Sequence, residues 1–221
     1  MIDNLQNHIE TVIDMAFKRV QYAYDHKKEN GPIPPEIQSE PVSRLVFPSY
    51  TNNSTRISEQ ELRFCFTEAF NEYFQGKNIP VYYSVETPTR RNYIKFSKSK
   101  ECPNPIPQEA EEAEKKGRSG EFDLVVYELD AGIMKRRCLI EFKANNASPL
   151  DHEKDFVKLN NPKEWSKEGV KDVELRYFIE MTEGYRADTL NSLRVKTQKK
   201  SDTRFICYSL KKNKDISDEI I

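Results

Sequence analysis

The stretch EFDLVVYELDAGIMKRRCLIEFKA, residues 121–144, decides the fold. Residues 121–129 contain Phe122, Val125, Val126 and Tyr127, and residues 135–143 end in alternating apolar and charged side chains, so both read as strands. Asp-Ala-Gly at residues 130–132 is typical of a tight turn between two strands. We therefore expect an antiparallel hairpin over residues 121–143.

The first 57 residues contain a helix and a proline-rich arm. Apolar side chains recur at helical spacing from Leu5 to Tyr24 and form one stripe, which predicts an amphipathic helix. The helix should end near Asn30, because the prolines in residues 31–57 remove donors and favour extended backbone. The apolar stripe either packs back on the rest of the chain or forms a homodimer.

A second helix and a strand precede the hairpin. Ser58 and Glu61 match a capping box, and the helical pattern continues to Gly76. Residues 81–85 form a β-branched and aromatic strand, and residues 89–120 read as a charged loop or short hairpin.

Four further elements follow the hairpin. They are a helix opened by Ser148-Pro149 and reaching Asn160, a strand at 173–181, a helix at 185–195 and a strand at 204–210. The order α-β-β-β-α-β predicts an α/β (α+β) fold, with a mixed central sheet flanked by helices. We divide the chain into an N-terminal helix and arm, 1–57, and an α/β domain, 58–221.

Composition excludes several classes of protein. The chain has 221 residues, of which 32% are charged, with a net charge of -1 and 11% aromatic residues. These values predict a folded, cytoplasmic protein without membrane contact, whose nucleic-acid binding must come from local clusters of charge. The four cysteines are too widely spaced for a zinc or redox pair, and we expect them to be reduced and mostly buried.

The candidate chemistry lies near the open end of the hairpin. Strand alternation places Glu141 and Lys143 on one face, about 7 Å apart, and Phe142 on the other. Pairing within the hairpin brings Asp123 beside Glu141. Two carboxylates this close repel unless a cation lies between them, and Mg²⁺ suits such a pair.

At these residues the sequence resembles the PD-(D/E)XK nuclease superfamily. Asp123 matches the acid of the hairpin, Glu141-Phe142-Lys143 matches the (D/E)XK tripeptide, and the order of elements fits over residues 58–181. The resemblance implies hydrolysis of phosphodiester bonds, usually in DNA, dependent on Mg²⁺ or Mn²⁺. Asp123, Glu141 and the Phe142 carbonyl would hold the ion, and Lys143 would act on the attacking water.

Two positions leave alternatives open. Phe122 replaces the proline of the family motif, and Glu121 is either a second ligand or a charge at a strand end. The family often supplies another acid from the helix before the first strand. Glu61 is the candidate, although capping alone explains it, and Glu68 could substitute.

The cations that we assign to contact with nucleic acid are Arg90, Arg91, Lys95, Lys154 and Lys158. Tyr93 and Phe96 lie among the first three, a pattern that suits phosphate contacts combined with stacking.

Other interpretations remain. Glu141 and Lys143 could be an exposed ion pair on a half-solvated strand, or the chain could be an inactive module of the nuclease fold that binds nucleic acid or a protein. We expect His152 to be a surface residue of its helix and Trp165 to anchor a loop.

Overall fold

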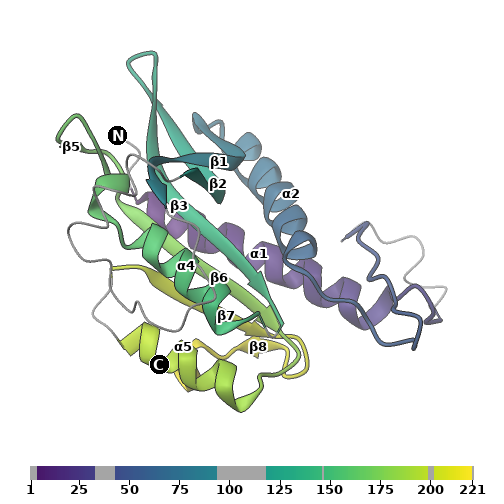
Figure 1. Ribbon diagram of the computed structural model, residues 1–221. Coiled ribbons are helices and arrows are strands. Elements are labelled where there is room, and N and C mark those ends of the chain that lie inside the picture. The colour runs from purple at the N-terminus through teal and green to yellow at the C-terminus, as the bar shows by residue number, and fades with distance from the viewer. Residues whose placement is uncertain (1–3, 33–42, 94–117, 146, 199–201, 221) are drawn as a thin grey trace.

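A six-stranded mixed sheet forms the centre of the computed structural model, which describes residues 4–32, 43–93, 118–145, 147–198 and 202–220 (Figure 1). The strands, in spatial order, are β1 (Val81–Tyr93), β2 (Arg118–Asp130), β3 (Ile133–Ala144), β6 (Leu175–Thr182), β7 (Arg204–Ser209) and β8 (Lys214–Asp215). The first three strands are antiparallel, β3, β6 and β7 are parallel, and β8 is antiparallel to β7. The α/β fold with a mixed central sheet is thus confirmed.

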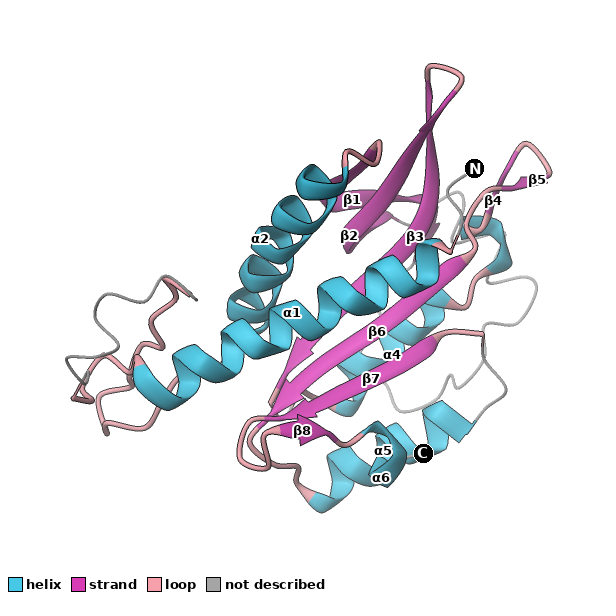
Figure 2. Ribbon diagram, turned by 180° about the vertical axis from the view of Figure 1, so that it is seen from behind, coloured by secondary structure: helices cyan, strands magenta, loops and turns pink. Residues whose placement is uncertain are grey.

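Helices cover both faces of this sheet. They are α1 (Leu5–His26), α2 (Glu59–Lys77), α4 (Pro149–Leu159), α5 (Ala187–Gln198) and α6 (Ser217–Ile220). Figures 1 and 2 show α1 and α2 on one face and α4 and α5 on the other. A short 3-10 helix, η2 (Pro162–Glu164), and the hairpin of β4 (Ser166–Lys167) and β5 (Val170–Lys171) connect α4 to β6.

The apolar stripe of α1 is buried within the chain. Its side chains share one core with α2 and with the strands that α1 crosses. Phe17, for example, stacks on Tyr208 of β7, with their ring centres 4.6 Å apart. Of the two alternatives for this helix, the structure therefore has it packed back on the domain.

The central hairpin forms as the sequence predicts. Leu124 pairs with Ile140, and the turn places Ala131 and Gly132 at φ 48° and 79°. Positive φ at both central positions is the geometry of a type I′ turn, whose twist matches that of the flanking strands. Glycine is needed at the second position because it adopts this conformation without steric cost.

β1 is longer than expected. The sequence predicted a strand over residues 81–85 and a loop from Thr89, whereas β1 continues to Tyr93. Hydrogen bonds hold this extension: Gly120 N donates to Thr89 Oγ1, and the Glu164 carboxylate accepts from the backbone N–H of the two residues after Thr89. The last three residues of the predicted loop, 118–120, belong to β2, and residues 94–117 lie outside the described residues.

Strand alternation on β3 divides its side chains as predicted. Ile140 and Phe142 belong to the core under α1 and α2, and Leu139 belongs to the core under α4 and α5. Three cysteines, Cys65, Cys138 and Cys207, are buried free thiols, and Cys102 lies outside the described residues. Within the described ranges, every helix is too short or too polar to cross a membrane.

Candidate functional site

Asp123 lies next to Glu141, across the β2–β3 ladder. The last ladder pair before the open end joins Leu124 to Ile140, so the following positions in antiparallel register are 123 and 141. Asp123 Oδ2 accepts a hydrogen bond of 2.7 Å from the backbone N–H of Phe142. The hairpin thus holds Asp123 at the start of the motif-like tripeptide, and the half-buried Asp123 side chain remains partly open to solvent.

Glu141 is a buried carboxylate with an ammonium partner. Its side chain is 1% exposed, and its Oε1 lies 2.5 Å from Nζ of Lys158 on α4. Burial raises the pKa of Glu141 well above its usual value, and the nearby Asp155 and Asp123 carboxylates raise this pKa further, whereas Lys158 lowers it. The site thus disfavours an ionised Glu141 unless a cation remains beside it.

Lys143 is held by acids from two helices. Its Nζ lies 2.8 Å from Asp155 Oδ2 and 3.2 Å from Glu59 Oε2, and it donates a 2.9 Å hydrogen bond to the Phe142 carbonyl. Burial alone would lower the pKa of Lys143, but Asp155, Asp123 and Glu59 together raise it above the ordinary value. Lys143 is therefore a protonated donor at neutral pH and not a free base.

Asp155 links the two lysines. Its Oδ1 lies 2.9 Å from Lys158 Nζ, while Oδ2 binds Lys143. Burial would raise the pKa of Asp155, but the two ammonium groups lower it below the usual value. Lys158 also donates to the Glu121 carbonyl at 2.7 Å, and its own pKa is raised, because Glu141 and Asp155 outweigh burial.

Sequence reasoning missed Asp155 and Glu59. The signal for Asp155 lay in the α4 sequence: it shares a face with His152, Phe156 and Leu159, at the spacing of a buried helical stripe. A charged residue on a buried stripe needs a partner. Glu59 gives no comparable signal, because an acid at the first position of a helix is already explained by the helix dipole.

Glu61 caps its own helix and does not reach the carboxylate cluster. Its Oε2 accepts from the Ser58 N–H at 2.8 Å, and its Oε1 lies 3.0 Å from Arg56 Nη2. The predicted capping box is confirmed, and from α2 it is Glu59 that contacts Lys143. Glu68 binds Arg19 at the surface.

The cations predicted to contact nucleic acid differ in their surroundings. Arg90 holds both oxygens of Asp172, at 2.8 and 2.5 Å, so its guanidinium already has a structural partner. Lys158 is buried in the carboxylate cluster and is not part of an exposed phosphate-binding face. Arg91 is half-buried, Lys154 is exposed, and Lys95 lies outside the described residues.

A second buried polar group lies beside Lys143. In the parallel register, Lys143 of β3 pairs with Glu180 of β6, which pairs with Cys207 of β7. His152 Nε2 lies 3.5 Å from Glu180 Oε2, and both side chains are fully buried. The expectation of a surface His152 is therefore wrong, because α4 turns this residue onto the sheet. Burial raises the pKa of Glu180, although His152 lowers it.

The expectation for Trp165 is confirmed. Its Nε1 donates to the Leu159 carbonyl at 2.8 Å, and its ring packs on the Arg176 guanidinium, which ties the loop after α4 to the sheet.

Carboxylate oxygens, the ligands that a hard divalent cation prefers, are gathered in this cluster. Four carboxyl groups, from Glu59, Asp123, Glu141 and Asp155, surround the two ammonium groups of Lys143 and Lys158, and the raised pKa of Glu141 favours its protonated form. Among the described residues, no group of three or more His, Cys, Asp or Glu has the arrangement to hold a metal. Mg²⁺ commonly uses only one or two carboxylates and completes its shell with water and phosphate oxygens.

This arrangement offers oxygen ligands and a protonated lysine at one end of a hairpin. Such a group can hold a cation, and with it the phosphate of a substrate. Comparison of the chain with protein-family models, curated proteins and solved structures found no match.

Proposed function

We propose that this protein is a Mg²⁺-dependent phosphodiester hydrolase that acts on DNA. The observation that carries the proposal is the convergence of Asp123, Glu141 and Lys143 at the open end of one hairpin. It is the arrangement that the resemblance to PD-(D/E)XK nucleases predicts, with Phe122 in place of the motif proline as its departure.

Asp123 and Glu141 are the residues that would hold Mg²⁺ or Mn²⁺. The bound cation supplies charge stabilisation and activates water for attack on phosphorus. Asp123 keeps one oxygen on the Phe142 N–H, which leaves its other oxygen for a ligand. The Phe142 carbonyl, a further candidate ligand, already accepts a hydrogen bond from Lys143, and a carbonyl oxygen has a second lone pair.

Lys143 supplies positive charge where negative charge develops. In hydrolysis, a water oxygen forms a bond to phosphorus while the bond to the leaving oxygen breaks, and charge accumulates on the phosphate oxygens. Because its pKa is raised, Lys143 stays protonated, which favours hydrogen-bond donation to these oxygens and orientation of water over proton abstraction. Glu59 and Asp155 fix the position of Lys143.

The substrate would bind along the same end of the sheet. Lys154, exposed on α4, and Arg91 of β1 remain candidates for contacts with the phosphate backbone. Such contacts position a duplex and carry no sequence information, so we expect DNA binding without a preferred sequence.

Cleavage of a supercoiled plasmid in Mg²⁺ tests the assignment. We expect nicking by the wild-type chain, its loss with EDTA, and a loss of about a hundredfold or more in Asp123→Asn and Lys143→Ala. Glu168→Gln and Lys211→Ala change an exposed acid and an exposed lysine on other elements, and both controls should cut like wild type. Equal cutting by all five proteins would remove the hydrolase assignment.

One observation favours a second candidate function, an inactive module of the same fold. The Lys158 Nζ lies 2.5 Å from Glu141 Oε1, so an ammonium group already supplies the cation that the buried acid requires. If this pair were permanent, the cluster would be a structural network. Isothermal titration calorimetry separates the two functions: the hydrolase requires Mg²⁺ or Mn²⁺ binding that is lost in Asp123→Asn, and the module shows none.

A further inference from the structure

A polar cavity lies where the parallel strands begin, at the end of β3, β6 and β7 away from Lys143. It has a volume of about 390 Å³ and is bordered by Lys171, Arg176, Asp202 and Arg204, where β6 and β7 begin. In the parallel register, Arg176 pairs with Leu139 of β3, two residues before Glu141, and the residues that line the cavity include none of the carboxylate cluster. The cavity is therefore separate from the carboxylate cluster.

Arg176 is a buried cation with unused hydrogen-bond capacity. Its side chain is 1% exposed, and its guanidinium carbon lies 3.8 Å from the centre of the Trp165 ring. Among the described residues, Nε and Nη1 have no hydrogen-bond partner, while Nη2 lies 3.1 Å from Asp202 Oδ2. A buried guanidinium normally has a counter-ion and a hydrogen-bond acceptor for each donor nitrogen. Arg176 lacks acceptors for two of its three nitrogens among the described residues.

Asp202 is a poor permanent partner for this arginine. It is 82% exposed, and an ion pair with so exposed a carboxylate is weak because water competes for it. Asp202 contacts only one of the three guanidinium nitrogens. A ligand that carries more negative charge could therefore take its place on Arg176.

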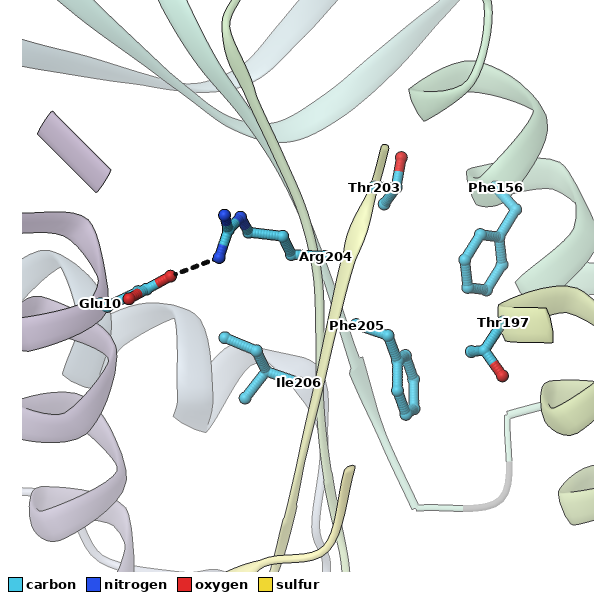
Figure 3. A pocket seen from close by; sticks show the side chains of 7 residues that line it. All are labelled: Glu10, Phe156, Thr197, Thr203, Arg204, Phe205 and Ile206. Atoms are coloured by element: carbon cyan, nitrogen blue, oxygen red, sulfur yellow. Dashed lines mark hydrogen bonds and ion pairs between the residues drawn. The ribbon is translucent and has the colours of Figure 1, made fainter. Parts of the chain in front are cut away.

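The other acids near the cavity already have partners. Glu174 binds Arg137 at 2.8 Å, and Glu10 binds Arg204 at 2.9 Å. Figure 3 shows Arg204 pointing toward Glu10, on the other side of β7 from Phe205. When Asp202 is set aside, the charge that the described residues leave for a ligand comes from Arg176 and the exposed Lys171.

We propose that this cavity binds a phosphate group, which displaces Asp202 from Arg176 and is held by Arg176 and Lys171. Arg176 offers a planar fork of donors, backed by the Trp165 ring, and this geometry matches phosphate oxygens. A phosphate dianion carries two negative charges, equal to the positive charges of Arg176 and Lys171. A carboxylate carries one negative charge and, like Asp202, would neutralise only one of these two cations.

Trp165 provides a direct optical probe, because it is the only tryptophan in the chain and it stacks on Arg176. Titration of the full chain with inorganic phosphate, at constant ionic strength, should give a saturable change in tryptophan fluorescence. Acetate should act more weakly, and chloride should give no saturable change. An equal response to all three anions, or no response to phosphate, overturns the proposal.

Two variants should shift the phosphate dissociation constant in opposite directions. Arg176→Met removes the guanidinium and should raise the constant by about thirtyfold or more. Asp202→Asn removes the competing charge at an exposed position and should lower it by about two- to fivefold. Lys212→Gln, an exposed change outside the cavity, should leave it unchanged.

The Asp202 variant keeps the test decisive if Arg176→Met fails to fold. Weaker or unchanged phosphate binding by Asp202→Asn would contradict the displacement of Asp202, and so would a Lys212→Gln response equal to that of either cavity variant.

Discussion

Replacement of Lys158 by methionine tests whether the ammonium group in the carboxylate cluster stands in for a metal. Lys158 contacts Glu141, Asp155 and the Glu121 carbonyl, at 2.5, 2.9 and 2.7 Å, and its side chain is 4% exposed. Methionine keeps the length of the side chain and removes the charge. Because buried Glu141 loses its ammonium partner and Asp155 keeps only Lys143, we expect the free energy of unfolding to fall by about 3–5 kcal/mol at neutral pH.

The size of this loss should depend on pH. Burial, Asp155 and Asp123 raise the pKa of folded Glu141 above the unfolded value of 4.5. The folded state then binds the Glu141 proton more tightly than the unfolded state does, so stability falls as the pH rises from the unfolded pKa through the folded pKa. Lys158 limits this fall, and its removal should therefore cost most above the folded pKa and progressively less as the pH approaches 4.5.

If the cluster binds a metal ion, Mg²⁺ should restore part of the stability that Lys158→Met loses. Mg²⁺ at about a hundredfold excess over its dissociation constant stabilises a protein by about 2.7 kcal/mol. In Lys158→Met the ion has no ammonium group to displace, so its thermal stabilisation should exceed that of wild type. The measurement is thermal unfolding with and without Mg²⁺, and a loss of about 3–5 kcal/mol corresponds to a fall in Tm of about 6–20 °C.

Lys154→Met, an exposed change on the same helix, is the control and should alter stability by less than about 0.5 kcal/mol. If Mg²⁺ stabilises neither wild type nor Lys158→Met, the reasoning fails and the cluster is a closed ion-pair network.

Four further substitutions test the surrounding contacts. Glu59→Gln should reduce plasmid cleavage by about tenfold or more while leaving urea unfolding nearly unchanged. Glu61→Ala should cost about 1 kcal/mol of stability because it removes the acceptor of the capping box, and the reverse pattern would contradict these roles. Arg90→Ala should lower stability by about 1–3 kcal/mol through the lost pair with Asp172, and weaker DNA binding without lower stability would restore Arg90 as a nucleic-acid contact. Glu180→Gln should gain stability relative to wild type as the pH rises above 4.5, because the raised pKa of Glu180 makes its ionisation costly in the folded state; parallel stability curves for the two proteins would refute this.

The fold was largely accessible from the sequence because its elements carry strong local signals. The stripe of α1, the capping box of Ser58, the Ala131-Gly132 turn and the Ser148-Pro149 helix start all depend on neighbours within a few residues. The extension of β1 to Tyr93 was missed because its support comes from Gly120 and Glu164, far along the chain.

The site was accessible only in part for the same reason. Asp123, Glu141 and Lys143 follow from strand alternation and hairpin pairing, which are local rules. Asp155 and Glu59 join them because α4 and α2 pack against the sheet at a particular offset. No periodicity within either helix specifies that offset.

Asp155 also determines how readily the cluster could exchange its cation. It is bound to Lys143 through one oxygen and to Lys158 through the other, so Lys158 could leave Glu141 and still keep a buried counter-ion. The cost of such a movement is then limited to the contact with Glu141, which an incoming divalent ion replaces with a stronger one. In a permanent structural network, four carboxyl groups would share two ammonium groups, and the raised pKa of Glu141 would relieve the repulsion by keeping Glu141 protonated. In the proposed metal site, by contrast, a divalent ion would balance the same acids with Glu141 ionised, so the protonation state of Glu141 is what separates the two functions.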